Sequence, residues 1–323
     1  GRLFHNGNSS PAQGEYLRPS SLVTSPSFKK PNANNIGTTR VYPSRINPGV
    51  NRAYLPNILV EEGPNKGKLA NFTAASGNQI YRGDQFPAEF YGVSFTPEPA
   101  GNLVSVRRVI EQQGMLGGTE LYPESEILTS TDERFRPVNL NTAPDGSLYI
   151  VDMYHGIIQH KEFLTTYLRE QYESRGLDKN NRSMGRIYRL RWQDRPLGVA
   201  PHLNDKSAAQ LVAYLTHTNG WWRDTARRLL VQLGDQTVVP AIRKLLNDQK
   251  TDHLGKISAL WTLEGLGGLN LASIEAGLTD AHPKVQISAI ALSIRLAKVD
   301  HPIIAKHLNE MASSDYEVAL QIA

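Results

Sequence analysis

A change in composition near residue 200 is the feature that most restricts how this 323-residue chain can fold. Residues 1–200 contain 15 of the 19 prolines and 19 of the 26 glycines. Because helix interiors exclude both residue types, this part is predicted to consist of strands and turns. The remainder is rich in Ala and Leu at helical spacing. We therefore predict two domains, 1–200 and 201–323, with a boundary near Leu197 to Leu203.

Short segments rich in β-branched and aromatic residues recur through the first domain. They are LANFTAAS, GNQIYRGD, EFYGVSFTPE, NLVSVRRVI, VNLNTA, SLYIVDMY and GRIYRLRW. Two turn sequences separate strands, at 99–102 and 143–146. One helix is expected at 164–178, ended by Gly176. Residues 1–68 show little periodicity and are interpreted as long irregular loops. Such regularly spaced short strands favour a propeller, a barrel or a sandwich.

Helical periodicity replaces the strand pattern after residue 204. The predicted helices are SAAQLVAYLTH, WWRDTARRLLVQLG, QTVVPAIRKLLND, LGKISALWTLEGLG, NLASIEAGLTD, HPKVQISAIALSIRLA and HPIIAKHLNEMAS. Pro283 and Pro302 each stand at the start of one of them, where proline is favoured. Paired helices at this spacing indicate a solenoid of the HEAT or armadillo type.

Several classes of function find no support in the composition. The chain has no cysteine, which excludes disulfides and thiolate catalysis within it. The formal net charge is +4, and no Lys/Arg cluster is interleaved with aromatic residues, so nucleic acid is not an expected partner. No apolar run is long enough to span a membrane, and no metal-ligand cluster or nucleotide-binding motif is present. The start at Gly1 and the helix-like end lead us to expect a piece of a longer protein.

Two arginines, Arg134 and Arg136, stand two positions apart just before the turn at 143–146. On a strand, residues at this spacing share a face. Two guanidinium groups on one face could bind the carboxylates of a ligand in a bidentate manner, with Phe135 pointing into the core. The alternative is a structural role, in which both arginines pair with local carboxylates such as Asp132, Glu133 or Asp152.

Three segments together resemble a known protein family. They are YRGDQFPAEFYGVSFTPEPAGNLV (81–104), RFRPVNLNTAPDGSLYIVDMYHGIIQH (134–160) and GRIYRL (185–190), with further likeness at 46–56 and 217–232. The chain resembles the membrane-bound dehydrogenase-type proteins of planctomycetes and related bacteria. Their propeller is similar to that of the quinoprotein glucose/sorbosone dehydrogenases, and HEAT-like helices and often a cytochrome c domain follow it. The resemblance implies a partial β-propeller followed by a HEAT-like α-solenoid.

The resemblance also implies a cofactor site. In the quinoprotein sugar dehydrogenases an Arg-x-Arg pattern before such a turn contacts pyrroloquinoline quinone, a pattern matched here by Arg134 and Arg136. Arg82 could add a third cation, or could instead pair with Asp84 in a turn. His155 is a candidate proton acceptor, or else a structural histidine. His160 is open to the same two interpretations.

The function implied by the resemblance is a quinone-dependent sugar or alcohol dehydrogenase module that passes electrons to a cytochrome c. Pyrroloquinoline quinone and calcium would be its cofactors, and haem would lie only in a domain outside this chain. The expected location is periplasmic or extracellular. The alternative is a non-catalytic scaffold that binds a carbohydrate or a protein in a larger complex. In either case, missing blades or another chain are expected to cover the exposed strand edges.

Overall fold

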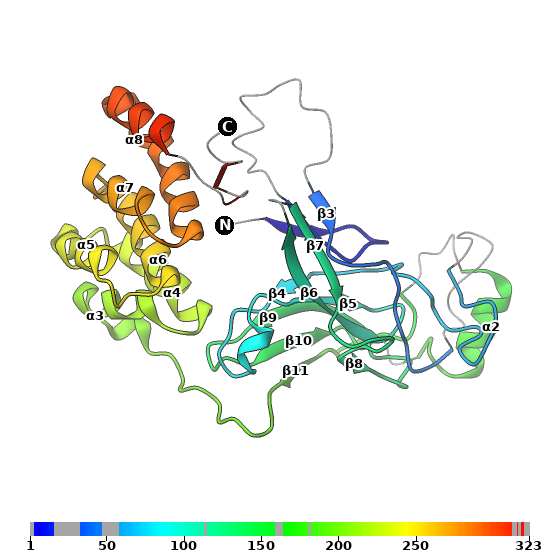
Figure 1. Cartoon of the computed structure of the whole chain (residues 1–323). Coiled ribbons are helices and arrows are strands. Elements are labelled where there is room, and N and C mark those ends of the chain that lie inside the picture. The colour runs from blue at the N-terminus through cyan, green and yellow to red at the C-terminus, as the bar shows by residue number, and fades with distance from the viewer. Residues whose placement is uncertain are drawn as a thin grey trace. The chain divides into compact units, whose positions relative to one another are not determined.

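The computed structural model describes residues 3–15, 33–46, 58–112, 115–158, 164–179, 182–311, 315 and 318–319 (Figure 1). The chain divides into two compact units. A β-rich unit comprises residues 2–143 and 147–197, and a helical unit comprises residues 198–323 together with 144–146. Strands therefore precede helices, and the coarse prediction of a β plus α chain is confirmed.

The β-rich unit contains three antiparallel sheets among the described residues. The first has the order β1-β2-β3, the second β4-β5-β6-β7 with β8 paired to β6, and the third β11-β10-β9. The strands of the first sheet are β1 (Phe4–Asn6), β2 (Ala12–Glu15) and β3 (Ala33–Asn35); those of the second are β4 (Gln79–Ile80), β5 (Ser94–Glu98), β6 (Leu103–Gln112), β7 (Met115–Glu120) and β8 (Leu128–Thr129); those of the third are β9 (Pro137–Thr142), β10 (Leu148–Asp152) and β11 (Arg186–Leu190). No sheet closes on itself within these described ranges.

A shared apolar core joins the second and third sheets. It contains Tyr81, Phe86, Phe90, Val93, Phe95, Val104, Val106, Leu140, Leu148 and Ile150. The rings of Tyr81 and Phe86 stack with centroids 4.6 Å apart, and Phe86 meets Phe90 edge to face. Burial raises the pKa of Tyr81 to about 12. Alternation places the apolar side chains of β10 in this core, as its burial pattern shows.

Most predicted strands of this unit are present, with four differences. The two-residue strand β8 lies outside every predicted segment. Residues 69–76 form isolated bridges at Leu69 and Asn71 instead of a strand. The irregular loops predicted for 1–68 include the small β1–β3 sheet, whose short Asn- and Gly-containing strands show no alternation. β7 was not predicted, because its sequence MLGGTE contains two glycines. Most of the family-like segment 46–56 lies outside the described residues.

The predicted turns and the inserted helix are confirmed. Residues 143–146 join β9 to β10, and residues 99–102 join β5 to β6. α2 (Thr166–Ser174) begins at Thr165, whose hydroxyl accepts a hydrogen bond from the Leu168 amide. Gly176 has a φ of 65°, and the amide of Leu177 donates to the carbonyl of Tyr172. This bond closes the helix with a glycine in the left-handed region.

The helical unit contains one apolar core built from all of its longer helices. The described elements are η3 (Leu203–Asp205), α3 (Ala208–Val212), η4 (Ala213–Thr216), α4 (Gly220–Leu233), η5 (Gln236–Val238), α5 (Val239–Asn247), α6 (His253–Gly265), α7 (Leu271–Leu278) and α8 (Pro283–Glu310); η1 (Ala88–Phe90) lies in the β-rich unit. None of the described helices combines the length and hydropathy needed to span a bilayer.

α8 corrects the prediction of two separate helices at 282–297 and 301–313. It is one helix of 28 residues with Pro302 inside it. Proline removes one backbone hydrogen bond and disfavours the helical conformation of the residue before it, which is why a break was predicted. The residues before Pro302 are Ala297, Lys298, Val299, Asp300 and His301, with neither Gly nor Asn among them. The helix continues through the proline.

Candidate functional site

Arg134 and Arg136 do not lie on a strand. The two residues belong to the turn and extended segment that precede β9, which begins at Pro137. The assumption that they share one strand face is therefore wrong. Phe135 is buried between them and meets the ring of Tyr188 edge to face, with centroids 5.9 Å apart. Its predicted place in the core is confirmed.

The Arg136 guanidinium is buried and bonded to backbone carbonyls. Its side chain is only 4% exposed. Nη1 donates to the carbonyl of Pro99 at 2.7 Å, while Nε and Nη2 donate to those of His155 and Gly156, both at 3.0 Å. Burial lowers the pKa of Arg136 to about 10. All three nitrogen atoms therefore join this segment to the β5–β6 turn and to the loop after β10.

Arg134 contacts the end of α2. Its Nη2 donates to the carbonyl of Gly176 at 2.6 Å, the glycine that ends this helix. Two of the local carboxylates, Asp132 and Asp152, accept hydrogen bonds from the backbone amides of the two arginines. Asp132 Oδ1 accepts from the Arg134 amide at 2.9 Å, and Asp152 Oδ1 accepts from the Arg136 amide at 2.7 Å. Burial raises the pKa of Asp152.

Glu133, which directly precedes Arg134, is shared by two further arginines. It bonds to Arg45 and lies 2.5 Å from Nη1 of Arg175. The structure thus brings Arg45, Arg134, Arg136 and Arg175 around the start of β9. We call these four residues the arginine junction. Arg45 also donates to Asn102 Oδ1 and Arg175 to Gln171 Oε1, and together these contacts fasten the segment before β9 to its neighbours.

The other predicted residues occupy separate positions. His155 lies in the loop after β10, where Nδ1 bonds to the carbonyl of Ile157 and its own carbonyl accepts from Arg136. Arg82 is half-buried in the loop after β4. His160 lies outside the described residues.

These positions do not fit a tricarboxylated quinone held by Arg134 and Arg136. Such a ligand needs guanidinium donors directed into a space it can enter. The donors of Arg136 are inside the protein on three carbonyls, and replacing those contacts would leave three buried acceptors without partners. Within the described residues, no group of three or more His, Asp or Glu side chains is arranged to hold a metal ion.

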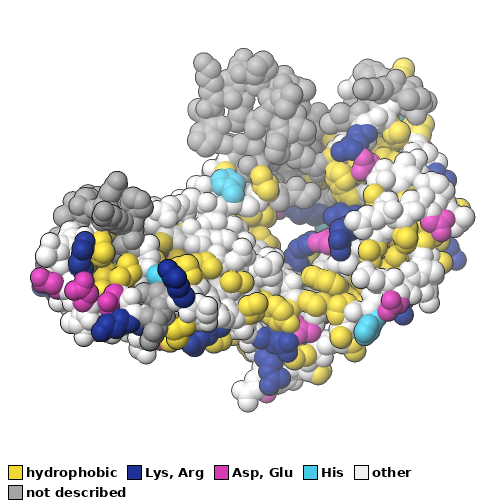
Figure 2. Space-filling view, turned by 180° about the vertical axis from the view of Figure 1, so that it is seen from behind, with side chains coloured by type: hydrophobic (Ala, Val, Ile, Leu, Met, Phe, Trp, Pro, Cys, Tyr) yellow, Lys and Arg dark blue, Asp and Glu magenta, His cyan; other side chains and the backbone are white. Residues whose placement is uncertain are grey.

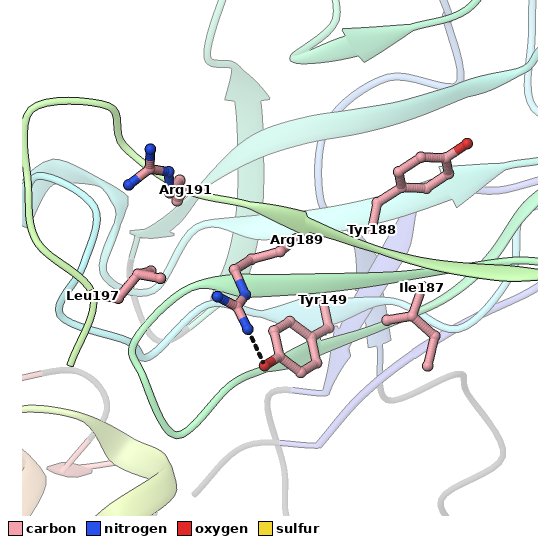
Figure 3. A pocket seen from close by; sticks show the side chains of 6 residues that line it. All are labelled: Tyr149, Ile187, Tyr188, Arg189, Arg191 and Leu197. Atoms are coloured by element: carbon pink, nitrogen blue, oxygen red, sulfur yellow. Dashed lines mark hydrogen bonds between the residues drawn. The ribbon is translucent and has the colours of Figure 1, made fainter. Parts of the chain in front are cut away.

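A groove on the third sheet is a more accessible candidate (Figure 3). It has a volume of about 610 Å³ and is lined by Tyr149, Ile187, Tyr188, Arg189, Arg191 and Leu197. Figure 3 shows Arg189 reaching toward Tyr149, with Ile187 further along the strand. Arg189 Nη2 donates to the Tyr149 hydroxyl at 3.1 Å, and its guanidinium lies 5.4 Å from the centre of that ring. We call this feature the β10–β11 groove.

The groove combines apolar, aromatic and cationic side chains at the surface. Ile187 is 69% exposed and Tyr188 is 39% exposed, which is high for apolar residues of a strand. Arg189 stands opposite Tyr149 in the β10–β11 register, and Ile187 stands opposite Val151. Such a surface suits an anionic group next to an apolar one.

Sequence reasoning predicted β11 as a strand but missed the groove. The available signal was the segment RIYRLRW, which contains three arginines and two aromatic residues. Periodicity alone does not reveal that this strand has a single neighbour, β10, among the described strands. On the face drawn in Figure 2, Lys and Arg side chains lie among acidic and apolar ones, without one continuous basic surface among the described residues.

Comparison with known proteins bears on the β-rich part. No curated protein and no solved structure matches the chain. A family model described as "Domain of unknown function (DUF7133)" matches residues 1–194, which is 194 of the 323 residues. The chain therefore belongs to this family of domains of unknown function.

Proposed function

We propose that the β-rich unit is a non-catalytic binding module that holds an anionic partner in the β10–β11 groove. The observation that carries this proposal is the presence of Arg189 and Arg191 beside Tyr149 and Ile187 at one accessible surface. Arginine binds carboxylate, sulfate or phosphate groups bidentately, and the apolar side chains can cover the rest of a ligand. The helical unit would then serve as the scaffold that links this module to a larger complex.

Within this proposal the two units have the architecture that the resemblance implies. β4, β5, β6 and β7 follow one another as an antiparallel meander, which is the arrangement of one propeller blade. β9, β10 and β11 would be three strands of a second blade. α4 to α8 would be HEAT-like helices that bury a shared core by stacking. Further strands, from this protein or a partner, would complete the propeller.

The contacts of Arg134 and Arg136 give no support to the quinone site that the resemblance implies at these two residues. Arg136 is bonded to three carbonyls, and Arg134 to the end of α2. Electron transfer to a cytochrome c and a periplasmic or extracellular location remain predictions from the resemblance.

Binding measurements with defined anionic probes test the proposed function. The full chain would be titrated with an acidic peptide and with a sulfated oligosaccharide, and heat release would be recorded. Arg189→Glu should weaken binding of at least one probe by about tenfold, since one attractive charge becomes repulsive. Lys66→Glu is the matched control, because Lys66 is exposed in a turn of the same unit.

Two results would overturn the proposal. One is equal binding by the wild-type protein and Arg189→Glu with every anionic probe. The other is uptake of pyrroloquinoline quinone, seen by absorbance, followed by sugar-dependent dye reduction. The second result would establish the dehydrogenase instead.

A further inference from the structure

The β11 strand has one described strand neighbour and a largely exposed surface. In its sheet the order is β11-β10-β9, so β11 pairs with β10 alone among the described strands. Its residues Arg186, Ile187, Tyr188 and Arg189 are all exposed, whereas β10 is buried at alternate positions. A strand at a sheet edge directs every second N–H and C=O away from its neighbour. Such groups can bind an added strand.

Cations lie on both faces of this strand, each next to a tyrosine ring. The Arg186 guanidinium carbon lies 3.5 Å from the centre of the Tyr154 ring. Arg189 bonds to Tyr149, as described above. Because successive side chains alternate between faces, residues three apart point to opposite faces. A strand added beside β11 would therefore meet one arginine on each face, with Ile187 and Tyr188 between them.

We propose that β11 receives an extended acidic segment of a partner protein by strand addition. This proposal rests on the proposed anion-binding function and specifies its partner. Directly opposite residues on adjacent strands interact through their side chains. The preferred core sequence therefore reads acid–apolar–apolar–acid. The acids face Arg186 and Arg189, while the apolar residues face Ile187 and Tyr188.

The charges of β11 disfavour two other occupants. A second copy of the same strand would bring Arg186 and Arg189 of both copies into one ladder that contains no carboxylate. A neutral strand would bring no opposite charge to Arg186 or Arg189, and charged residues on edges discourage such pairing. The charges of β11 therefore favour an acidic strand as its binding partner. Asp132 already lies near Tyr154, so the Arg189 face should contribute more to binding.

Two peptides with the same composition but a different residue order test the proposed spacing of the acidic residues. The full chain would be titrated with SGEVVEGS and with SGVEEVGS by fluorescence anisotropy. We expect SGEVVEGS to bind about tenfold more tightly, since its acids align with both arginines. Arg189→Glu should remove this preference, and a peptide with one Glu changed to Lys should restore binding to that variant. Lys66→Glu should behave like the wild-type protein.

Backbone pairing needs a separate readout. Hydrogen exchange of the β11 amides should slow when SGEVVEGS is bound. Alternate peptide amides would face β11, so N-methylation of that set should abolish binding, whereas N-methylation of the other set should not. Equal affinity of the two peptides, or no change in exchange at β11, would overturn strand addition. If a sulfated oligosaccharide binds with sensitivity to Arg189→Glu while no peptide binds, the anion-binding function stands and this inference fails. If neither probe binds, both fail.

Discussion

His253 and His282 stack face to face in the helical unit, with ring centroids 3.9 Å apart and planes inclined by 3°. His253 is the first residue of α6, and His282 precedes α8 with its Nδ1 accepting from the Lys284 amide at 3.1 Å. Burial lowers the pKa of His253, and the neighbouring His282 acts in the same direction. Asp252 and Asp280 oppose this effect, whereas Arg223 reinforces it.

The helical unit should therefore lose stability under mildly acidic conditions. A histidine whose folded pKa is depressed takes up its proton more readily when unfolded. Its contribution to stability is present above about pH 6.5, the usual histidine pKa, and is lost as the pH falls below it. Denaturant unfolding followed by tryptophan fluorescence should show this decrease between neutral pH and pH 5.

Substitution of one ring isolates the effect of the stack. His282→Asn keeps an oxygen that can accept from the Lys284 amide but removes the second imidazole. We expect a smaller loss of unfolding free energy on acidification in this variant. His202→Asn, at an exposed position, is the matched control. An unchanged pH dependence in His282→Asn would contradict the role of the stack.

Glu98 should produce the opposite pH dependence in the β-rich unit. Its carboxylate is fully buried and accepts from the amides of Thr73, Ala74 and Ala100. Burial raises the pKa of Glu98 to about 7. The folded state therefore holds this proton more tightly than the unfolded state, whose pKa is near 4.5. Its contribution to the unfolding free energy should fall by up to about 3 kcal/mol as pH rises from 4.5 to 7.

Glu98→Gln tests the same carboxylate directly. The amide nitrogen of glutamine would face the backbone N–H groups that Glu98 now accepts from, and a donor cannot bond to a donor. We expect a loss of about 2–3 kcal/mol in unfolding free energy and a weaker pH dependence. Glu89→Gln, at an exposed position, should change neither quantity. A stable Glu98→Gln protein with the wild-type pH profile would contradict this account.

Arg136→Lys should destabilise the β-rich unit even though charge is kept. A single ammonium group cannot reach the carbonyls of Pro99, His155 and Gly156 with the planar geometry of a guanidinium. We expect the unfolding free energy to fall by about 3 kcal/mol. Arg134→Lys has the carbonyl of Gly176 within reach of its ammonium group and should cost about 1 kcal/mol. If both substitutions lowered the thermal midpoint by the same small amount, the structural role of Arg136 in the arginine junction would be contradicted.

Pro302→Ala tests whether α8 is one helix. Inside a helix, proline lacks the N–H that bonds to the preceding turn. Alanine should therefore raise the unfolding free energy of the helical unit by about 1–3 kcal/mol and increase helical circular dichroism. Pro283→Ala is the control, since Pro283 stands at the start of α8, where proline is tolerated. No gain in Pro302→Ala would indicate two helices, as the sequence pattern first suggested.

Local sequence patterns were sufficient for much of the fold. Alternation correctly located β5, β6, β9, β10 and β11, and helical periodicity located α4 to α7. The turn at 143–146 and the helix end at Gly176 followed from residues with specific backbone preferences. β7 and the β1–β3 sheet were missed because their pairing partners, and not their own composition, make them strands.

The candidate site could not be predicted from local sequence patterns in the same way. The carbonyls that bind Arg136 belong to Pro99, His155 and Gly156, which lie up to 37 positions away in the sequence. No local pattern shows such contacts, so an arginine pair with a spacing suited to a ligand could not be distinguished from one that fastens loops. For the β10–β11 groove, the deciding property is the edge position of β11, which depends on the order of strands in space.

Because Arg136 donates to three backbone carbonyls, variants at this position should change the signal of a genetic screen through protein stability. Substitutions there should lower the amount of soluble protein in the cell, and any assay output will fall in proportion. A screen normalised to protein abundance would score Arg136 as neutral for recognition, while Arg189 would retain its defect after the same correction.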